Sequence, residues 1–339
     1  MLSLVLIKFI AAVIIEYNTN DALESVVSNM AADVPEITRL VYSELEKKGY
    51  KGRIISTQHI AELKEEIEAR YKERALDKIF YQERLANFEF TVPSNILGAS
   101  SIIITSAPQP QQRVIFNLMG KTYHLTIPPT YSGKTDKKIE NILLVTLKSR
   151  GFSLYPAVLP AKLLAVRSGL AKYGKNNITY IEGMGSFHRL KVFLSDLPAV
   201  EDAWFESRLM EQCNKCSACV NKCPTKAITP DRFLIQAEKC LTFHNERQNE
   251  FPNWIKPSWH NCLIGCMDCQ LTCPVNKRFF NWFEEAESFN ERETELILEG
   301  TPRHRLPKAT ANKLQRLYLL DDMNLISRNL NILIKRCSP

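Results

Sequence analysis

The sequence has no hydrophobic run long enough to cross a bilayer. The apolar stretch Met1 to Ile15 contains Ser3 and Lys8 and is shorter than the roughly 20 residues that a spanning helix needs. It has no positively charged start and no convincing cleavage site, so an export signal is not predicted. We expect a buried or surface-lying helix there, or an artefactual extension upstream of Met30, and no membrane partner.

Compositional extremes are also missing. With 45% hydrophobic and 24% charged residues in 339, the chain is neither disordered nor fibrous, and its length predicts two to three globular domains. A chain of this size can build a hydrophobic core without disulfide bonds, and no small secreted domain is evident. Its ten cysteines are therefore not expected to form a disulfide framework.

Eight of the ten cysteines fall in two short runs. The first run, Cys213 to Pro224, has the spacing C-x2-C-x2-C-x3-C-P, with which bacterial ferredoxins hold a [4Fe-4S] cluster. The second, Cys262 to Pro274, also ends in Cys-Pro. Zinc sites normally use two separated cysteine pairs, so three cysteines in a row favour clusters over zinc. The runs predict two clusters within electron-transfer distance, in the reducing cytoplasm.

The ligands of each cluster are expected to come from both runs. In two-cluster ferredoxins the cysteine of each Cys-Pro ligates the other cluster. The predicted ligands are Cys213, Cys216, Cys219 and Cys273 for the first cluster, and Cys223, Cys266 and Cys269 for the second.

One ligand of the second cluster has two candidates. Cys262 is one residue out of step with a regular repeat, which would place a cysteine where the chain has Leu263. Cys240 is remote in sequence but can fold back. Whichever is not a ligand should be a small buried apolar side chain, and Cys337 should be a plain terminal thiol.

The positive net charge is weak evidence for a nucleic-acid partner. The formal charge is +7, but two clusters of roughly −2 each would reduce it to about +3.

Apolar periodicity predicts the elements ahead of the cysteines. Tyr123 to Gly133, aromatic and rich in turn residues, is expected to be an irregular loop, either a binding edge or a surface crossover. The predicted elements are helices from Asp33 to Gly49, His59 to Arg74 and Lys137 to Arg150, and strands from Ser101 to Thr105 and Gln112 to Phe116.

A helix, a glycine-hinged turn and a polar group precede a strand between Leu159 and Tyr180. The polar group is Lys175-Asn176-Asn177, and Gly183, Gly185 and Ser186 follow the strand. Such glycines let the backbone approach a ligand closely, although glycine turns between helix and strand are common in any fold.

Together the two stretches resemble epoxyqueuosine reductase. The resemblance rests on the cysteine pattern with one isolated cysteine, preceded by Arg167-Ser-Gly-Leu, Gly174-Lys-Asn and Gly185-Ser-Phe, and covers roughly Arg113 to Lys277. It implies a nitroreductase-like α/β domain that binds cobalamin, as in the related reductive dehalogenases, joined to a two-cluster ferredoxin-like domain. It also implies that Cys240 is the eighth cluster ligand and that Gly169, Lys175, Asn176, Gly185 and Ser186 lie along the corrin.

The chain departs from that family at its proton donor. Where epoxyqueuosine reductase has an aspartate ahead of this helix, this chain has Tyr155. A tyrosine keeps its proton at neutral pH and can protonate a strongly basic anion, so Tyr155 is the candidate catalytic acid, with simple packing as the alternative.

The C-terminal region is predicted to be helical from Glu291 to Gly300, Ala309 to Leu320 and Asp322 to Lys335. The resemblance implies a tRNA-holding extension here, shortened in this chain, and its basic loop contains Arg303, His304, Arg305 and Lys308. The expected fold is α+β. Its predicted domains are a helical segment 1–95, an α/β domain 96–205, the double-cluster domain 206–285 and a helical extension 286–339.

Three functions follow, in order of preference. The first is a cobalamin-dependent reductase in which two [4Fe-4S] clusters, reduced by ferredoxin or flavodoxin, pass electrons toward an unknown substrate. The second is a ferredoxin-like electron carrier without a corrinoid. The third is a tRNA-modifying epoxyqueuosine reductase proper, with salt-dependent tRNA binding.

Overall fold

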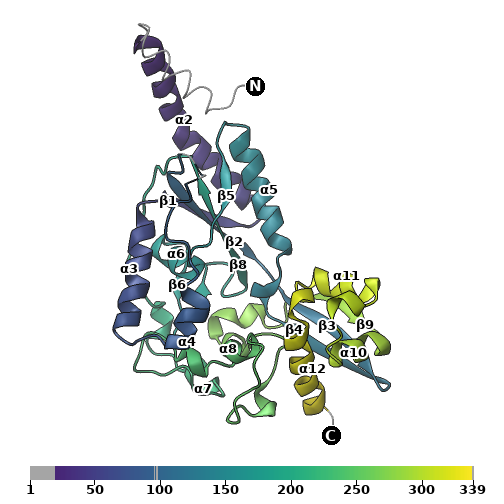
Figure 1. The fold of residues 1–339 in the computed structure, drawn as a ribbon. Helices are drawn as coiled ribbons and strands as arrows, with labels where there is room; N and C mark the ends of the chain where they lie inside the picture. Colours follow the sequence, from purple (N-terminus) through teal and green to yellow (C-terminus); the bar gives the residue numbers. More distant parts are fainter. Residues whose placement is uncertain (1–19, 95, 97, 338–339) are drawn as a thin grey trace.

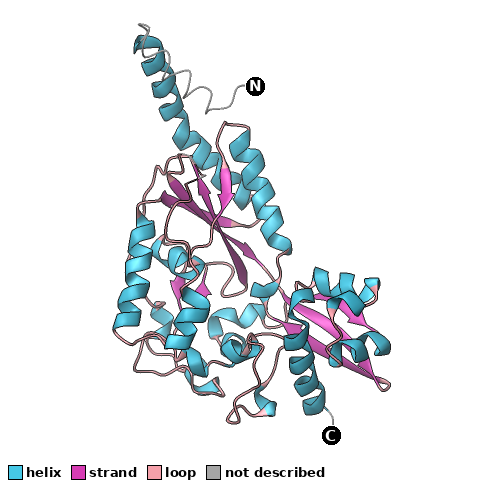
Figure 2. Ribbon diagram, viewed as in Figure 1, coloured by secondary structure: helices cyan, strands magenta, loops and turns pink. Residues whose placement is uncertain are grey.

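The computed structural model describes residues 20–94, 96 and 98–337 (Figure 1). The predicted helix from Met1 to Ile15 lies outside these residues, and so does the side chain of Cys337. The described chain mixes helices and strands, as predicted (Figure 2). Among the described residues no helix is both long and apolar enough to cross a membrane.

A four-stranded antiparallel sheet forms the centre of the larger part of the molecule. Its order is β1 (Lys51–Ser56), β2 (Ser101–Pro108), β8 (His188–Ser195) and β5 (Leu154–Pro156). The strand predicted from Ser101 is confirmed as β2, in which every residue but the last is buried. A strand buried on both faces has to be covered by helices on both sides.

Helices cover both faces of this sheet, and the side chains of β2 alternate between them. Ile103 packs with apolar residues of α2 (Asn20–Glu46) and α5 (Lys134–Lys148), whereas Ile102 and Ile104 pack with those of α3 (His59–Lys72) and α6 (Ala161–Arg167). The helices predicted from Asp33, His59 and Lys137 are thereby confirmed, although α2 begins earlier than expected.

A second sheet has three strands in the order β4 (Lys121–Ile127), β3 (Gln111–Leu118) and β9 (Phe283–Phe289). The prediction of an irregular loop from Tyr123 to Gly133 was wrong over its first half, because residues 121–127 pair antiparallel with β3. Tyr123, Leu125 and Ile127 alternate into the core, which is the period of a half-buried strand. Only residues 128–133 are irregular, with a 3-10 turn at Pro129–Tyr131.

The C-terminal helices complete this second unit. The three predicted helices are confirmed as α10 (Glu291–Leu298), α11 (Lys308–Arg316) and α12 (Met323–Cys337). Their apolar residues share one core with those of β3 and β4. Strand β9 pairs parallel with β3 and so connects the C-terminal region to residues 111–118. It also crosses residue 285, where a domain boundary was predicted.

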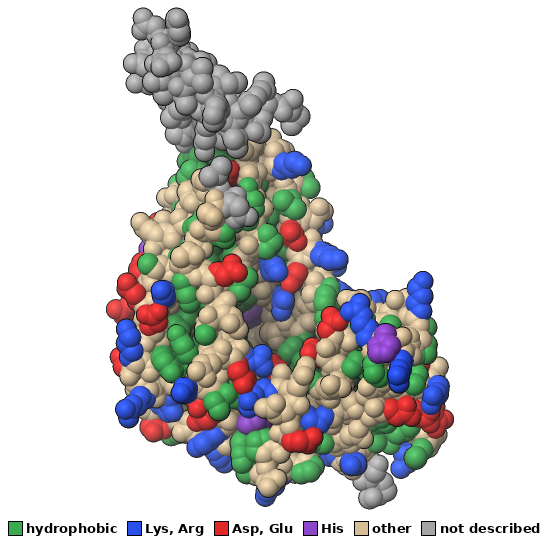
Figure 3. Space-filling model, in the orientation of Figure 1, with side chains coloured by type: hydrophobic (Ala, Val, Ile, Leu, Met, Phe, Trp, Pro, Cys, Tyr) green, Lys and Arg blue, Asp and Glu red, His purple; other side chains and the backbone are tan. Residues whose placement is uncertain are grey.

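The cysteine-rich region has little regular structure. It contains the short helices α7 (Ala218–Lys222), α8 (Leu241–Asn245) and α9 (Asp268–Leu271), and lies at the end of the molecule opposite the start of α2 (Figure 1). The two-residue strands β6 (Lys172–Tyr173) and β7 (Thr179–Tyr180) and the single-turn helix α4 (Lys78–Phe80) are also present. Figure 3 shows a hollow between the two sheet-containing parts.

Candidate metal centre

The cysteines predicted for the first cluster line one pocket of about 270 Å³. Two loops distant in sequence meet there, one ending in α7 and one preceding Pro274. The remaining walls come from the turn ahead of β7 and from the ring of Tyr180. The four cysteines lining the pocket are Cys213, Cys216, Cys219 and Cys273.

Two thiols of this pocket are disfavoured as thiolates. Burial, followed by the charge of the neighbouring cysteines, raises the pKa of Cys213 above its usual range and that of Cys219 to about 11. The backbone N–H of Lys175 acts in the opposite direction on Cys213. Thiolates in such surroundings require positive charge, which iron ions supply, so the donor set fits an iron–sulfur cluster.

The second group of cysteines lies beside the first. Cys223, Cys240 and Cys269 pack around one small apolar cluster with Ala227 and Ile228. Cys266 is close enough to Cys240 for the two to influence each other electrostatically, and burial raises its pKa to about 12.

The two candidates for the eighth ligand have different surroundings. Cys240 interacts electrostatically with Cys223 and Cys266, which come from different runs. Cys262 is buried with Phe187 and Met267. Its thiol donates to the Asn261 side chain at 3.1 Å, although it also lies close to Cys266. These contacts support Cys240 as the ligand and Cys262 as a packed thiol.

A cluster and a zinc ion make different demands on the arrangement of cysteines. Among the described residues no three His, Cys, Asp or Glu side chains converge as ligands of a single metal ion. A [4Fe-4S] cluster takes one thiolate for each iron, so its cysteines surround a cube and do not converge on one point. A zinc site would bring four ligands to one ion.

The Lys175-Asn176-Asn177 group holds the cysteine segments together. The Lys175 ammonium donates to the carbonyl of Cys216 at 3.0 Å, and the Asn176 side chain hydrogen-bonds the Cys269 sulfur. The Asn177 side chain donates to the Phe233 carbonyl at 2.8 Å and accepts from the Ile235 amide at 2.7 Å. This group therefore contacts both cysteine runs and the linker between them.

The other residues predicted along a corrin are also bonded within the protein. Ser186 is almost fully buried, and its hydroxyl donates to Gln270 at 2.8 Å and accepts from Asn276. Gly185 lies so close to Asn276 that an added Cβ would be 2.4 Å from its side-chain oxygen. At Gly169 an added Cβ would meet the ring of Phe205. These contacts occupy the polar side-chain groups of Asn176 and Ser186, and the placement of the five residues along a corrin stays a prediction.

The candidate acid Tyr155 lies at an edge of the central sheet. It pairs with Leu194 across β5 and β8 and packs, partly buried, against the core beside α3 and α6. Among the described residues it forms no hydrogen bond with a cysteine, and it does not line the pocket of the first cysteine group. Its assignment as proton donor stays a prediction.

Two tyrosines beside the cysteines were missed in the sequence. The Tyr180 hydroxyl hydrogen-bonds the Cys273 sulfur and accepts from Asn176 at 3.0 Å. The Tyr131 hydroxyl hydrogen-bonds Glu246 and lies close to Cys240. Tyr180 stands four residues after Asn176 on a short strand, and this was the only indication that the two side chains could meet.

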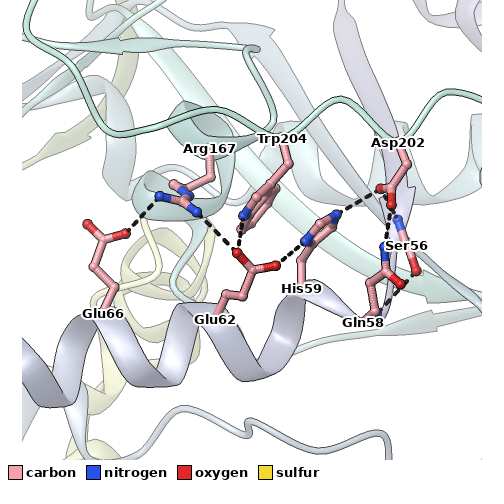
Figure 4. A network of polar contacts seen from close by, with 8 residues as sticks. All are labelled: Ser56, Gln58, His59, Glu62, Glu66, Arg167, Asp202 and Trp204. Carbon is pink, nitrogen blue, oxygen red and sulfur yellow. Dashed lines mark hydrogen bonds and ion pairs between the residues drawn. The ribbon is translucent and has the colours of Figure 1, made fainter.

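A polar network around His59 was missed as well (Figure 4). The His59 ring stacks on Trp204 with centroids 4.1 Å apart, and its two nitrogens contact Glu62 at 2.5 Å and Asp202 at 3.0 Å. Glu62 also accepts from the Trp204 indole at 2.9 Å and pairs with Arg167 at 3.3 Å. The network fastens residues 202–204, which lead into the cysteine region, onto α3.

Comparison with known proteins supports the metal centre. Residues 212–276 match the family model described as a 4Fe-4S double cluster binding domain. The chain is 34% identical over 116 residues to an epoxyqueuosine reductase of Leadbetterella byssophila, and this match covers 34% of this chain and 36% of the relative. It is 28% identical over 207 residues to that of Escherichia coli, which covers 60% of this chain and 51% of the relative. The matched regions thus span about a third to a half of these relatives.

Solved structures show the same fold. An epoxyqueuosine reductase solved with an epoxyqueuosine-modified tRNA-Tyr stem-loop superimposes with a TM-score of 0.64 at 18% identity, covering 89% of this chain and 82% of that one. The enzyme from Streptococcus thermophilus superimposes with a TM-score of 0.62 at 17% identity, covering 91% and 81%. These findings confirm the predicted resemblance to this family.

Proposed function

We propose that this chain, which resembles the epoxyqueuosine reductases in sequence and fold, is an iron–sulfur reductase with two [4Fe-4S] clusters. The observation that supports this most is the meeting of Cys213, Cys216, Cys219 and Cys273 from two distant runs in one pocket. When bound, the clusters would supply single electrons. Protein made anaerobically should contain about eight iron atoms and as much sulfide for each chain. A single zinc ion in place of iron would contradict the proposal.

We also propose a substrate, and here the order of the sequence hypotheses changes. The comparisons favour the third function, an epoxyqueuosine reductase proper, over a reductase of an unknown substrate. Conversion of an epoxide to an alkene and water consumes two electrons and two protons. The clusters would deliver the electrons one at a time, and the protein would have to supply or relay the protons.

The substrate proposal is tested with RNA. A tRNA stem-loop carrying epoxyqueuosine, incubated with the reduced protein, should yield the deoxygenated nucleoside by mass spectrometry. Arg303, Arg305 and Lys308 are exposed, and we propose that their loop contacts the RNA backbone. Changing all three to Gln should weaken binding and reduce its salt dependence. Unchanged binding would remove this loop from the proposed interface.

Tyr155 is the proposed proton donor. Tyr155→Phe should then lower the rate of the chemical step by about 10²-fold or more, with the clusters intact. If Tyr155 only packs against the core, the variant will retain full activity. A comparison of kcat with KM separates loss of a proton donor from weaker substrate binding.

The resemblance implies two further features, which stay proposals. One is a nitroreductase-like arrangement of the α/β part, residues 96–205. The proposed domains are residues 1–95, 96–205, 206–285 and 286–339. The other is cobalamin, to which no step is assigned. Anaerobic protein mixed with cobalamin would show retained visible absorption after gel filtration if a corrinoid binds. A chain with two clusters that binds no corrinoid and does not reduce the RNA would support the ferredoxin-like carrier instead.

A further inference from the structure

The segment from 212 to 230 presents an unusual balance of charge. It contains Lys215, Lys222 and Lys226 and no aspartate or glutamate. All three lysine side chains are exposed, and among the described residues none of them forms an ion pair. We call these three side chains the lysine surface.

The lysine surface alternates in sequence with the predicted cluster ligands. Lys215 stands between Cys213 and Cys216, and Lys222 precedes Cys223. Cys216 and Cys219 are part-exposed, so the first pocket comes close to the surface within this segment.

The backbone around Lys226 fixes the position of its side chain. Its φ of 56° lies in the left-handed region, which is uncommon for a residue with a side chain. Its ammonium donates to the carbonyl of Asn221, at the end of α7, at 3.4 Å. This contact holds Lys226 beside Lys222 on one short stretch of surface.

We propose that the lysine surface is the docking site for an acidic one-electron carrier protein. The inference rests on the proposed function, since only a chain that holds clusters needs such a donor. Electron transfer requires the two redox groups to approach closely, and the surface over Cys216 and Cys219 allows this. Unpaired positive charge around the entry point steers an acidic partner and speeds its association, with an interface that can be small.

The proposed RNA contact lies elsewhere, which makes the two roles separable. Arg303 and Arg305 belong to the unit built on β3, β4 and β9, between α10 and α11 (Figure 1). A donor site over the clusters and a substrate site on that unit would let both partners bind at once.

The experiment compares reduction of the cluster-loaded protein by two donors. Reduced flavodoxin, an acidic carrier, is mixed with native protein and with the variant Lys215→Gln/Lys222→Gln/Lys226→Gln, and bleaching of the cluster absorption is followed by stopped flow. The variant should be reduced at least tenfold more slowly at low salt, and added salt should slow the native protein but hardly affect the variant. Dithionite, a small reductant that needs no docking, should reduce both equally.

Two control variants sharpen the result. Lys137→Gln/Lys138→Gln/Lys148→Gln makes the same charge change on α5, away from the cysteine region, and should leave the flavodoxin rate unchanged. Arginine in place of the three docking lysines keeps the charge and should keep the rate.

Each contrary result has a defined meaning. The docking proposal is overturned if flavodoxin reduces the Gln variant as fast as the native protein, or if the α5 variant loses as much rate. It is also overturned if the Gln variant binds tRNA more weakly while its flavodoxin rate is unchanged. If the Gln variant loses its clusters, the docking site is tested instead by amide hydrogen exchange of the native protein, measured with and without flavodoxin. Slower exchange within 212–230 supports the proposal, and slower exchange confined elsewhere overturns it. Native protein that shows no bleaching with dithionite would contradict the proposed function itself.

Discussion

The side-chain amide of Asn176 donates a hydrogen bond of 3.0 Å to the hydroxyl of Tyr180. The same amide reaches Cys269, and the Tyr180 hydroxyl reaches Cys273. Asn176 and Tyr180 thus connect a predicted ligand of the second cluster with one of the first through two buried side chains. Hydrogen bonds to cluster sulfurs influence reduction potential, so this pair is a means by which the protein can set the driving force between the clusters.

Removing the Tyr180 hydroxyl should lower the potential of the first cluster. Tyr180→Phe keeps the ring but takes away a donor that stabilises the more negative, reduced state. A loss of about 1.4 kcal/mol corresponds to a tenfold change in the ratio of reduced to oxidised cluster, or 59 mV for one electron. Redox titration followed by electron paramagnetic resonance measures both potentials. A Tyr173→Phe variant, whose ring packs on Phe233, is the control.

Cys240 and Cys262 can be separated by their iron content. Cys240→Ser should reduce the iron of anaerobically purified protein from about eight atoms to about four, because one cluster loses a ligand. Cys262→Ser should keep both clusters and lose only some stability, because its thiol is packed with Phe187 and Met267. The opposite pattern would make Cys262 the ligand.

The local elements of this fold could be predicted from sequence because their apolar period is regular. The helices α3 and α5 each present such a period to one core, and β2 is a run of β-branched residues buried on both faces. Strand β4 was missed because prolines and aromatic residues after it suggest a loop, although Tyr123, Leu125 and Ile127 do alternate. Pairing of β9 with β3 could not be foreseen, since residues more than 160 positions apart meet there.

The site was predictable where it depends on spacing and unpredictable where it depends on folding. The spacing of the two cysteine runs predicts seven ligands, but the choice between Cys240 and Cys262 requires knowing which of them reaches Cys223. The sequence predicted that the Lys175-Asn176 group lines a ligand, because glycines beside polar residues suggest ligand binding as readily as contact with a loop. Contacts of Asn176 with the second run exist only after the chain has folded.

The network around His59 should contribute measurably to stability. Trp204→Phe keeps the stacking on His59 but removes the indole N–H that donates to Glu62 at 2.9 Å, at an expected cost of about 1 kcal/mol in the free energy of unfolding. Trp282→Phe is the control, because its indole N–H donates no hydrogen bond to another described residue. Urea unfolding of the cluster-loaded variants measures the difference. Equal midpoints for Trp204→Phe and the native protein would show that the bond to Glu62 adds nothing.

Acid should destabilise the protein through His188. Burial lowers the pKa of this histidine from 6.5 to about 4. The Gly185 carbonyl can only accept, so Nδ1 carries the proton, at 3.1 Å, and Nε2 accepts from the Thr179 hydroxyl at 3.0 Å.

Because the folded-state pKa of His188 lies below the unfolded value, its contribution is complete above pH 6.5 and is lost as the pH falls toward 4. The difference amounts to about 3 kcal/mol across that window. His188→Gln should flatten the fall in unfolding free energy between pH 6.5 and 4, whereas His124→Gln, at an exposed position of β4, should not. Since both variants keep the cysteines, acid loss of the clusters affects them alike, and equal slopes for His188→Gln and the native protein would exclude His188 as the source.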